Sequence, residues 1–160
     1  RQIIRMFCDC LTLGGNMLLD VGPKEDGTLD PRQEKILLDL GNWIHDNEEA
    51  IYETERGLSY NQFLGGSTLS ADKNTIYLFV YDKPLEYLCV KGVKTRAKRI
   101  TVLHTGEELT WRYTGGLPWY GIPGTLWIKA DSMELHPLTT VIKVELEDVI
   151  TYSFGHGDYA

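Results

Sequence analysis

The sequence predicts an α/β segment followed by an all-β antiparallel sandwich. Three observations support this expectation. Residues 1–51 contain two stretches with apolar residues at helical spacing, separated by one short apolar run, Met17–Val21. From about residue 60 onward, the pattern changes to alternation with a period of two. Turn formers separate these later segments, and no helical pattern interrupts them.

The composition argues against several classes of partner and site. A chain of 160 residues has room for one domain or two small ones. Its net charge of -7 argues against a nucleic-acid partner, and no apolar stretch is long enough to cross a bilayer. Three cysteines argue against a disulfide scaffold. We expect no cofactor and no metal, because there is no phosphate-binding glycine loop and the four histidines, His45, His104, His136 and His156, share no ligand spacing.

The first element is a helix over residues 1–13 that ends at Gly14-Gly15, since glycine adopts the left-handed conformation cheaply. The run Met17–Val21 follows and is apolar except for Asp20. Its length and flanks favour a strand, and its two apolar faces favour a parallel strand buried on both sides. Such a strand needs neighbours, and the rest of the sequence shows no parallel partner.

A second helix begins with firm signals. Asp30 is the expected N-cap, Pro31 occupies the first helical position, and Gln33 completes a capping box. The apolar face of this helix and its exit consists of Ile36, Leu37, Leu40, Trp43, Ile44 and Ile51. Helix, buried strand, loop and helix together are typical of an α/β fold.

The second half reads as a sandwich of seven or eight short strands. The expected strands are Thr75–Asp82, Tyr87–Lys91, Arg99–His104, 109–114, Thr125–Lys129, 142–147 and Val149–Phe154. A polar, glycine-bearing connection at Glu53–Gly66 separates the halves. We therefore predict two domains, residues 1–56 and 57–160.

The first half resembles the end of an α-L-fucosidase of glycoside hydrolase family 29. The resemblance depends on Gly14-Gly15-Asn16-Met17-Leu18-Leu19-Asp20-Val21-Gly22-Pro23, Asp26-Gly27-Thr28, Leu40-Gly41-Asn42-Trp43-Ile44 and 47–54. The second half resembles the family's C-terminal sandwich more loosely, at 76–80 and 140–146. At position 20 the family commonly has asparagine where this chain has aspartate.

The resemblance implies a (β/α)8-like barrel followed by a β-sandwich, with Met17–Val21 as the last barrel strand and Pro31–Asn47 as the last barrel helix. It also implies retaining hydrolysis of α-L-fucosides with an aspartate nucleophile and a separate acid/base. Both carboxylates come from earlier barrel segments, so no catalytic residue is assigned and this chain alone is expected to be inactive. The implied partners are a fucosylated glycan, through the full-length enzyme, and the missing barrel portion or a second copy. The implied compartments are periplasmic, secreted or lysosomal.

Two pairs of residues are candidates for a site. Barrel enzymes place their sites at the C-terminal ends of strands, which puts Asp20 near the substrate and Asn16 at the start of the strand. For Asp20 we favour a hydrogen-bonded anchor over a catalytic acid or sugar ligand. Trp119 and Tyr120, between Pro118 and Gly121, form the better candidate for an exposed aromatic surface. We favour packing against the barrel there, with a non-catalytic glycan-binding module as the competing function.

Overall fold

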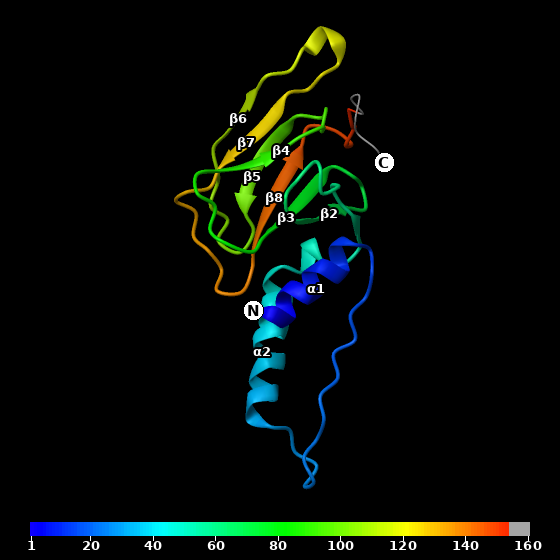
Figure 1. Ribbon diagram of the computed structural model, residues 1–160, viewed down its shortest axis with the longest axis vertical. Coiled ribbons are helices and arrows are strands. Elements are labelled where there is room, and N and C mark those ends of the chain that lie inside the picture. Colours follow the sequence, from blue (N-terminus) through cyan, green and yellow to red (C-terminus); the bar gives the residue numbers. More distant parts are fainter. Residues whose placement is uncertain (154–160) are drawn as a thin grey trace.

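The computed structural model describes residues 1–153 and arranges them in three layers (Figure 1). Two helices, α1 (Gln2–Thr12) and α2 (Pro31–Asp46), and the short helix η1 (Glu48–Ala50) precede the strands. The strands are β1 (Thr54–Arg56), β2 (Gly66–Ser70), β3 (Thr75–Val80), β4 (Tyr87–Val90), β5 (Ala97–Val102), β6 (Trp111–Thr114), β7 (Thr125–Lys129) and β8 (Thr140–Leu146), with the helical turn η2 (Pro118–Tyr120) between β6 and β7.

The strands form two sheets, and every strand pair in the described residues is antiparallel. The larger sheet has the order β1-β2-β3-β8-β5 and the smaller one the order β4-β7-β6. Side chains between the two sheets form the main core, in which Leu78, Ile100, Ile128 and Ile142 are fully buried. The antiparallel sandwich expected from the two-residue period is thus confirmed.

The central strand β3 is buried on both faces because a different layer covers each face. Ile76 and Leu78 point into the core between the sheets. Tyr77 and Phe79 point to the opposite side, where Ile4 and Cys8 of α1 and Trp43 of α2 pack on them. The helical segment therefore lies on the outer face of the larger sheet and closes a second, smaller core.

Both predicted helices form, with boundaries close to those expected. Gly14, which follows the end of α1, has φ +80, as the predicted glycine stop requires. The Asp30 side chain accepts a hydrogen bond from the Arg32 backbone N–H at 2.8 Å and caps α2. The capping box is wrong, however, because the Gln33 Oε1 atom is buried without a hydrogen-bond partner.

The predicted strand at Met17–Val21 is also wrong for this structure. The segment has no secondary structure and belongs to the long connection from α1 to the loop before α2 (Figure 1). Leu18 is 88% exposed. The physical reason is that a parallel strand exists only through hydrogen bonds to its neighbours, and the described residues contain antiparallel sheets alone.

The remaining differences concern the ends of the sandwich. Two strands, β1 and β2, were not predicted, and they form one edge of the larger sheet. The strand expected at Val149–Phe154 is reduced to an isolated bridge between Val93 and Tyr152, and Phe154 lies outside the described residues. In the described part of the chain, no helix is long and apolar enough to cross a membrane.

Candidate functional site

The connection from α1 to α2 displays both polar residues that the sequence singles out. Asn16 and Asp20 are exposed, and within the described residues neither side chain makes a hydrogen bond or ion pair. The expected anchoring role of Asp20 is therefore not seen here. Within residues 1–153, this segment by itself therefore shows no hydrogen-bonded catalytic arrangement.

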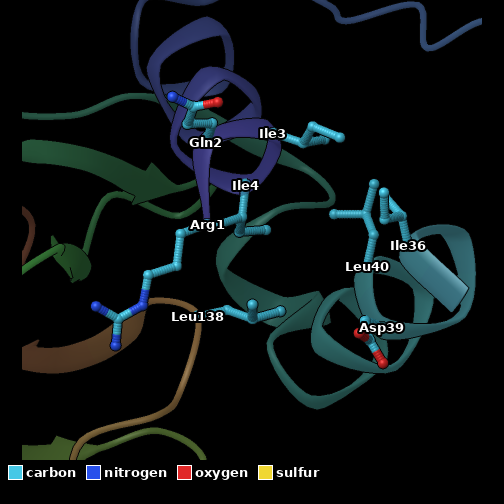
Figure 2. Close-up of a pocket in the computed structure, with 8 residues that line it drawn as sticks. All are labelled: Arg1, Gln2, Ile3, Ile4, Ile36, Asp39, Leu40 and Leu138. Atoms are coloured by element: carbon cyan, nitrogen blue, oxygen red, sulfur yellow. The ribbon is translucent and has the colours of Figure 1, made fainter. Parts of the chain in front are cut away.

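A groove of about 230 Å³ lies between the two helices (Figure 2). Ile3 and Ile4 of α1 face Ile36 and Leu40 of α2 across it, and Leu138 lies on the side of the sandwich. Its remaining lining residues are Arg1, Gln2 and Asp39. The groove is mainly apolar and contains one carboxylate.

A second groove, of about 340 Å³, lies where the end of α1 meets the edge strands β1 and β2. Asp9 and Arg56 supply opposite charges to it, and the Tyr81 hydroxyl donates a hydrogen bond to Asp9 Oδ1 at 3.0 Å. Burial, with the nearby Cys8 and Asp9, raises the pKa of Tyr81 far above its ordinary value. Tyr81 therefore stays protonated and acts as a donor. This groove, too, contains a single carboxylate.

Glycoside hydrolysis by the usual route needs two carboxyl groups that face each other across the scissile bond. The two helix-side grooves contain one carboxylate each, Asp39 and Asp9, and a third groove, beside η2, contains none. Residues 48–55 contain four glutamates, of which Glu49 has a structural role: its carboxylate accepts hydrogen bonds from Tyr77 Oη at 3.1 Å and Lys143 Nζ at 2.6 Å. None of these three grooves therefore contains an acid and nucleophile pair.

Trp119 and Tyr120 lie on η2 at the tip of the β6–β7 hairpin, 76% and 75% exposed. Figure 1 shows this tip at one end of the long axis of the molecule and the loop before α2 at the other. The structure therefore separates the hairpin tip from the loop before α2. It also places the pair far from the helices that the sequence associates with a barrel.

The backbone at the neck of the hairpin fixes the direction of the tip. Leu117 and Ile122 form a bridge, and Gly116 and Gly124 have positive φ and cross closely. A Cβ atom on Gly116 would lie 2.7 Å from the Gly124 backbone nitrogen, so only glycine fits at this crossing. The aromatic pair is thereby held outside the sandwich core.

Two cations beside the tip were missed at the sequence level. Lys94 and Arg96 line a groove of about 220 Å³ together with Gly121, Ile122 and Pro123. The sequence does indicate a basic segment here. Residues 87–106 contain no acidic residue and five basic ones, Lys91, Lys94, Arg96, Lys98 and Arg99. The chain as a whole has a net charge of -7, so this local excess of positive charge is distinctive.

The histidines form no metal centre in the part of the chain that is described. No group of three histidine, cysteine, aspartate or glutamate side chains within residues 1–153 is placed to hold a metal ion, and His156 lies outside those residues. His104 and His136 do meet, edge to face, with ring centroids 5.2 Å apart. Burial and the neighbouring His104 lower the pKa of His136, although Asp46 opposes them.

Comparison with known proteins identifies relatives for both halves of the chain. Residues 1–49 match the family model of α-L-fucosidase. Tissue α-L-fucosidase of Mus musculus is 33% identical over 113 residues, which are 69% of this chain and 25% of that protein. The α-L-fucosidase of Branchiostoma floridae is 27% identical over 125 residues, which are 78% of this chain and 26% of that protein.

A solved structure, α-L-fucosidase isoenzyme 1 from Paenibacillus thiaminolyticus, superposes with a TM-score of 0.76 at 26% identity. The match covers 92% of this chain and 34% of that protein, so it includes the helices as well as the sandwich. This chain spans about a quarter of the length of the curated relatives and about a third of the solved one.

Proposed function

The chain belongs to the α-L-fucosidase family over its matched residues, and from this premise we propose that it is the C-terminal part of a retaining α-L-fucosidase without a catalytic centre of its own. The main support is the match itself, which extends from the helices into the sandwich. In the whole protein, the substrate would be a fucosylated glycan.

The proposed division is a barrel-derived segment, residues 1–56, and a sandwich domain, residues 57–160. Three features favour a barrel origin for the first segment. Met17–Val21 is apolar but has no strand partner, Leu18 is exposed, and the first half of α2 exposes Ile36 and Leu38. Apolar surface of this kind usually marks a contact with further polypeptide. The last helix-strand-helix unit of a (β/α)8-like barrel would meet such polypeptide on these surfaces.

The absence of a catalytic centre is proposed because each described groove contains at most one carboxylate. The test is hydrolysis of an aryl α-L-fucoside by this polypeptide, with a full-length α-L-fucosidase as the positive control and circular dichroism to establish folding. We expect no release of the aryl group above the uncatalysed rate. Turnover at ordinary enzyme rates that is abolished by Asp20→Asn would refute the proposal.

A second candidate function is glycan binding by the sandwich, and the exposure of Trp119 and Tyr120 favours it. Aromatic side chains offer a large, stiff apolar surface with a polar edge, which suits the faces of sugar rings. We expect saturable binding of fucosylated oligosaccharides that is lost in Trp119→Ala. Tyr60→Ala is the matched control, because Tyr60 is equally exposed but lies outside the hairpin tip. A flat titration across a panel of such glycans would exclude this function.

A further inference from the structure

We propose that Lys94 and Arg96 form an anion-binding subsite beside Trp119 and Tyr120, so that the hairpin tip recognises a glycan carrying a sulfate or carboxylate group. The proposal rests on the second candidate function and goes beyond it by naming the chemistry of the ligand.

The geometry brings the two cations to the aromatic tip from another part of the chain. They lie on the β4–β5 connection, whereas η2 belongs to the β6–β7 hairpin. The groove of about 220 Å³ that they line is closed on the other side by Gly121, Ile122 and Pro123, which directly follow Tyr120. A Cβ atom on Gly121 would lie 3.8 Å from Lys94 Nζ, so the ammonium group reaches the tip itself.

Both cations are available to a ligand. Within the described residues, neither Lys94 nor Arg96 forms an ion pair, although Arg99 nearby does so with Glu108 at 3.9 Å. One acidic residue, Glu147, contacts Arg96 through the backbone: its N–H donates a hydrogen bond to the Arg96 carbonyl oxygen at 2.9 Å. Its carboxylate makes no ion pair with either cation, so their charge is not neutralised within the described structure.

The Arg96 side chain is also held in position before any ligand binds. Its guanidinium carbon lies 4.1 Å from the centroid of the Tyr113 ring, and the Tyr113 hydroxyl accepts a hydrogen bond from the Ala97 N–H at 2.9 Å. Tyr113 is therefore fixed at both its ring and its hydroxyl. A stacked guanidinium loses less freedom on binding, and its planar fork matches the oxygens of sulfate or carboxylate.

A flexible ammonium group, a fixed guanidinium group and two exposed aromatic rings together suit a ligand with both apolar faces and negative charge. A single-stranded nucleic acid has the same two properties. We favour a glycan because the chain belongs to a family of carbohydrate-active proteins. Nucleic-acid binding is one of the outcomes that the test distinguishes.

The test compares the Lewis a trisaccharide with its sulfated form, titrated into the protein at low ionic strength and followed by calorimetry. We expect the sulfated form to bind about fivefold to tenfold more tightly, because its anionic group gains two exposed ion pairs, each of modest strength. The preference should shrink in high salt, which screens exposed charges.

Three variants locate the effect. Lys94→Ser combined with Arg96→Gln should bind the sulfated form only as tightly as the neutral one. Trp119→Ala should weaken both ligands. Lys24→Ser combined with Lys83→Ser removes the same charge from exposed lysines outside the tip and should change neither affinity.

The possible failures are distinguishable. Equal affinity of the intact protein for the two trisaccharides would overturn the anion subsite and leave the aromatic glycan surface standing. No binding of either would overturn both. Binding of a single-stranded oligonucleotide more tightly than the sulfated trisaccharide, lost in the same variants, would overturn the assignment to a glycan.

Discussion

Trp43 joins the helical layer to the sandwich. It is the one buried residue of α2, and its indole Nε1 donates a hydrogen bond to the Thr139 carbonyl oxygen at 2.8 Å. Its ring meets Phe7 of α1 edge to face, with centroids 6.3 Å apart, and lies against Phe79 of β3 at 6.4 Å. One side chain thus contacts the other helix, the larger sheet and the loop before β8.

We predict that Trp43→Ala lowers the free energy of unfolding by about 3–5 kcal/mol, the usual cost of emptying a site of this size. Trp43→Phe keeps most of the apolar contact but leaves the buried Thr139 carbonyl without its donor, which costs about 1–3 kcal/mol. Urea titration followed by circular dichroism measures both. Leu38→Ala is the control on the same helix, since Leu38 is 61% exposed. Equal losses for Trp43→Ala and Leu38→Ala would contradict this account.

The three cysteines differ in reactivity because of burial. Cys8 is fully buried in the core under α1, and burial, with Asp9 beside it, raises its pKa far above the ordinary value of a thiol. Cys10 and Cys89 are half-exposed. The thiolate is the reactive form, so Cys8 lacks both access and charge.

We predict that a disulfide reagent such as DTNB modifies Cys10 in the folded protein and leaves Cys8 untouched until the chain unfolds. Cys8 should stay unmodified in the folded protein even at about pH 9, because its raised pKa keeps it protonated. Peptide mass spectrometry assigns the labelled sites, and denatured protein provides the reference rate. Labelling of Cys8 at the denatured rate would show that α1 does not cover the sheet.

At the scale of elements, the end of α2 lies against the loop that leads into β8, and local side-chain hydrogen bonds hold each of them. The Asn47 side chain donates to the Trp43 carbonyl oxygen at 2.9 Å, while His136 Nδ1 accepts the Leu138 N–H at 3.1 Å. His104 and Asp46 are the titratable groups that act on His136, and Arg1 Nε donates to the adjacent Pro137 carbonyl at 3.1 Å. An unprotonated Nδ1 is required for this turn.

The lowered pKa of His136 makes stability depend on pH. In the unfolded chain this histidine takes up a proton below about pH 6.5, whereas in the folded chain it does so only at lower pH. The unfolded state therefore binds more protons in that window, and stability falls as the pH drops below about 6.5. His136→Asn offers an acceptor at a similar position without a titratable group, so it should reduce this dependence. Urea midpoints measured between pH 7.5 and 5.5 test it, and identical pH profiles for both proteins would contradict it.

Helices marked by capping residues within their own few positions were predictable from the sequence. Strands that depend on hydrogen bonds to distant segments were not. The N-cap and first-turn proline of α2 and the glycine after α1 act within a few residues. By contrast, β2 has small polar residues that no pattern marks as a strand. Its Ser67 and Thr68 are buried because their hydroxyls bond to the Leu58 N–H and the Ala50 carbonyl, contacts that require the finished fold. At Met17–Val21 the error is the reverse: the composition predicts a strand, but no neighbouring strand is present to pair with it.

The same distinction holds for the candidate site. Exposure of Trp119-Tyr120 followed from proline and glycine beside them, which mark a loop. The proximity of Lys94 and Arg96 was not predictable, because it depends on the packing of two separate connections. The sequence placed Asp20 at the end of a buried strand. Asp20 is exposed because the segment pairs with no neighbouring strand.

At the scale of the whole molecule, the two ends of the long axis differ in character. One end presents aromatic and basic residues around η2, and the other presents apolar residues on α2 and on the connection before it (Figure 1). The second half of α2 packs on the sandwich through Leu40, Trp43 and Ile44, while Ile36 and Leu38 stay exposed. The sandwich thus has a complete core, and the helical layer covers only part of its own apolar surface.

We therefore predict that the isolated chain self-associates through its helical end. Burial of Leu18 and Leu38 between copies would remove apolar area from water, which favours association. Sedimentation velocity over a hundredfold range of concentration should show dimers or larger species that Leu18→Lys combined with Leu38→Lys converts to monomer. Leu64→Lys combined with Leu85→Lys is the control, because these leucines are equally exposed but lie on the sandwich. If amides at 17–21 exchange slowly in a strictly monomeric species, the segment is covered from within and the prediction is wrong.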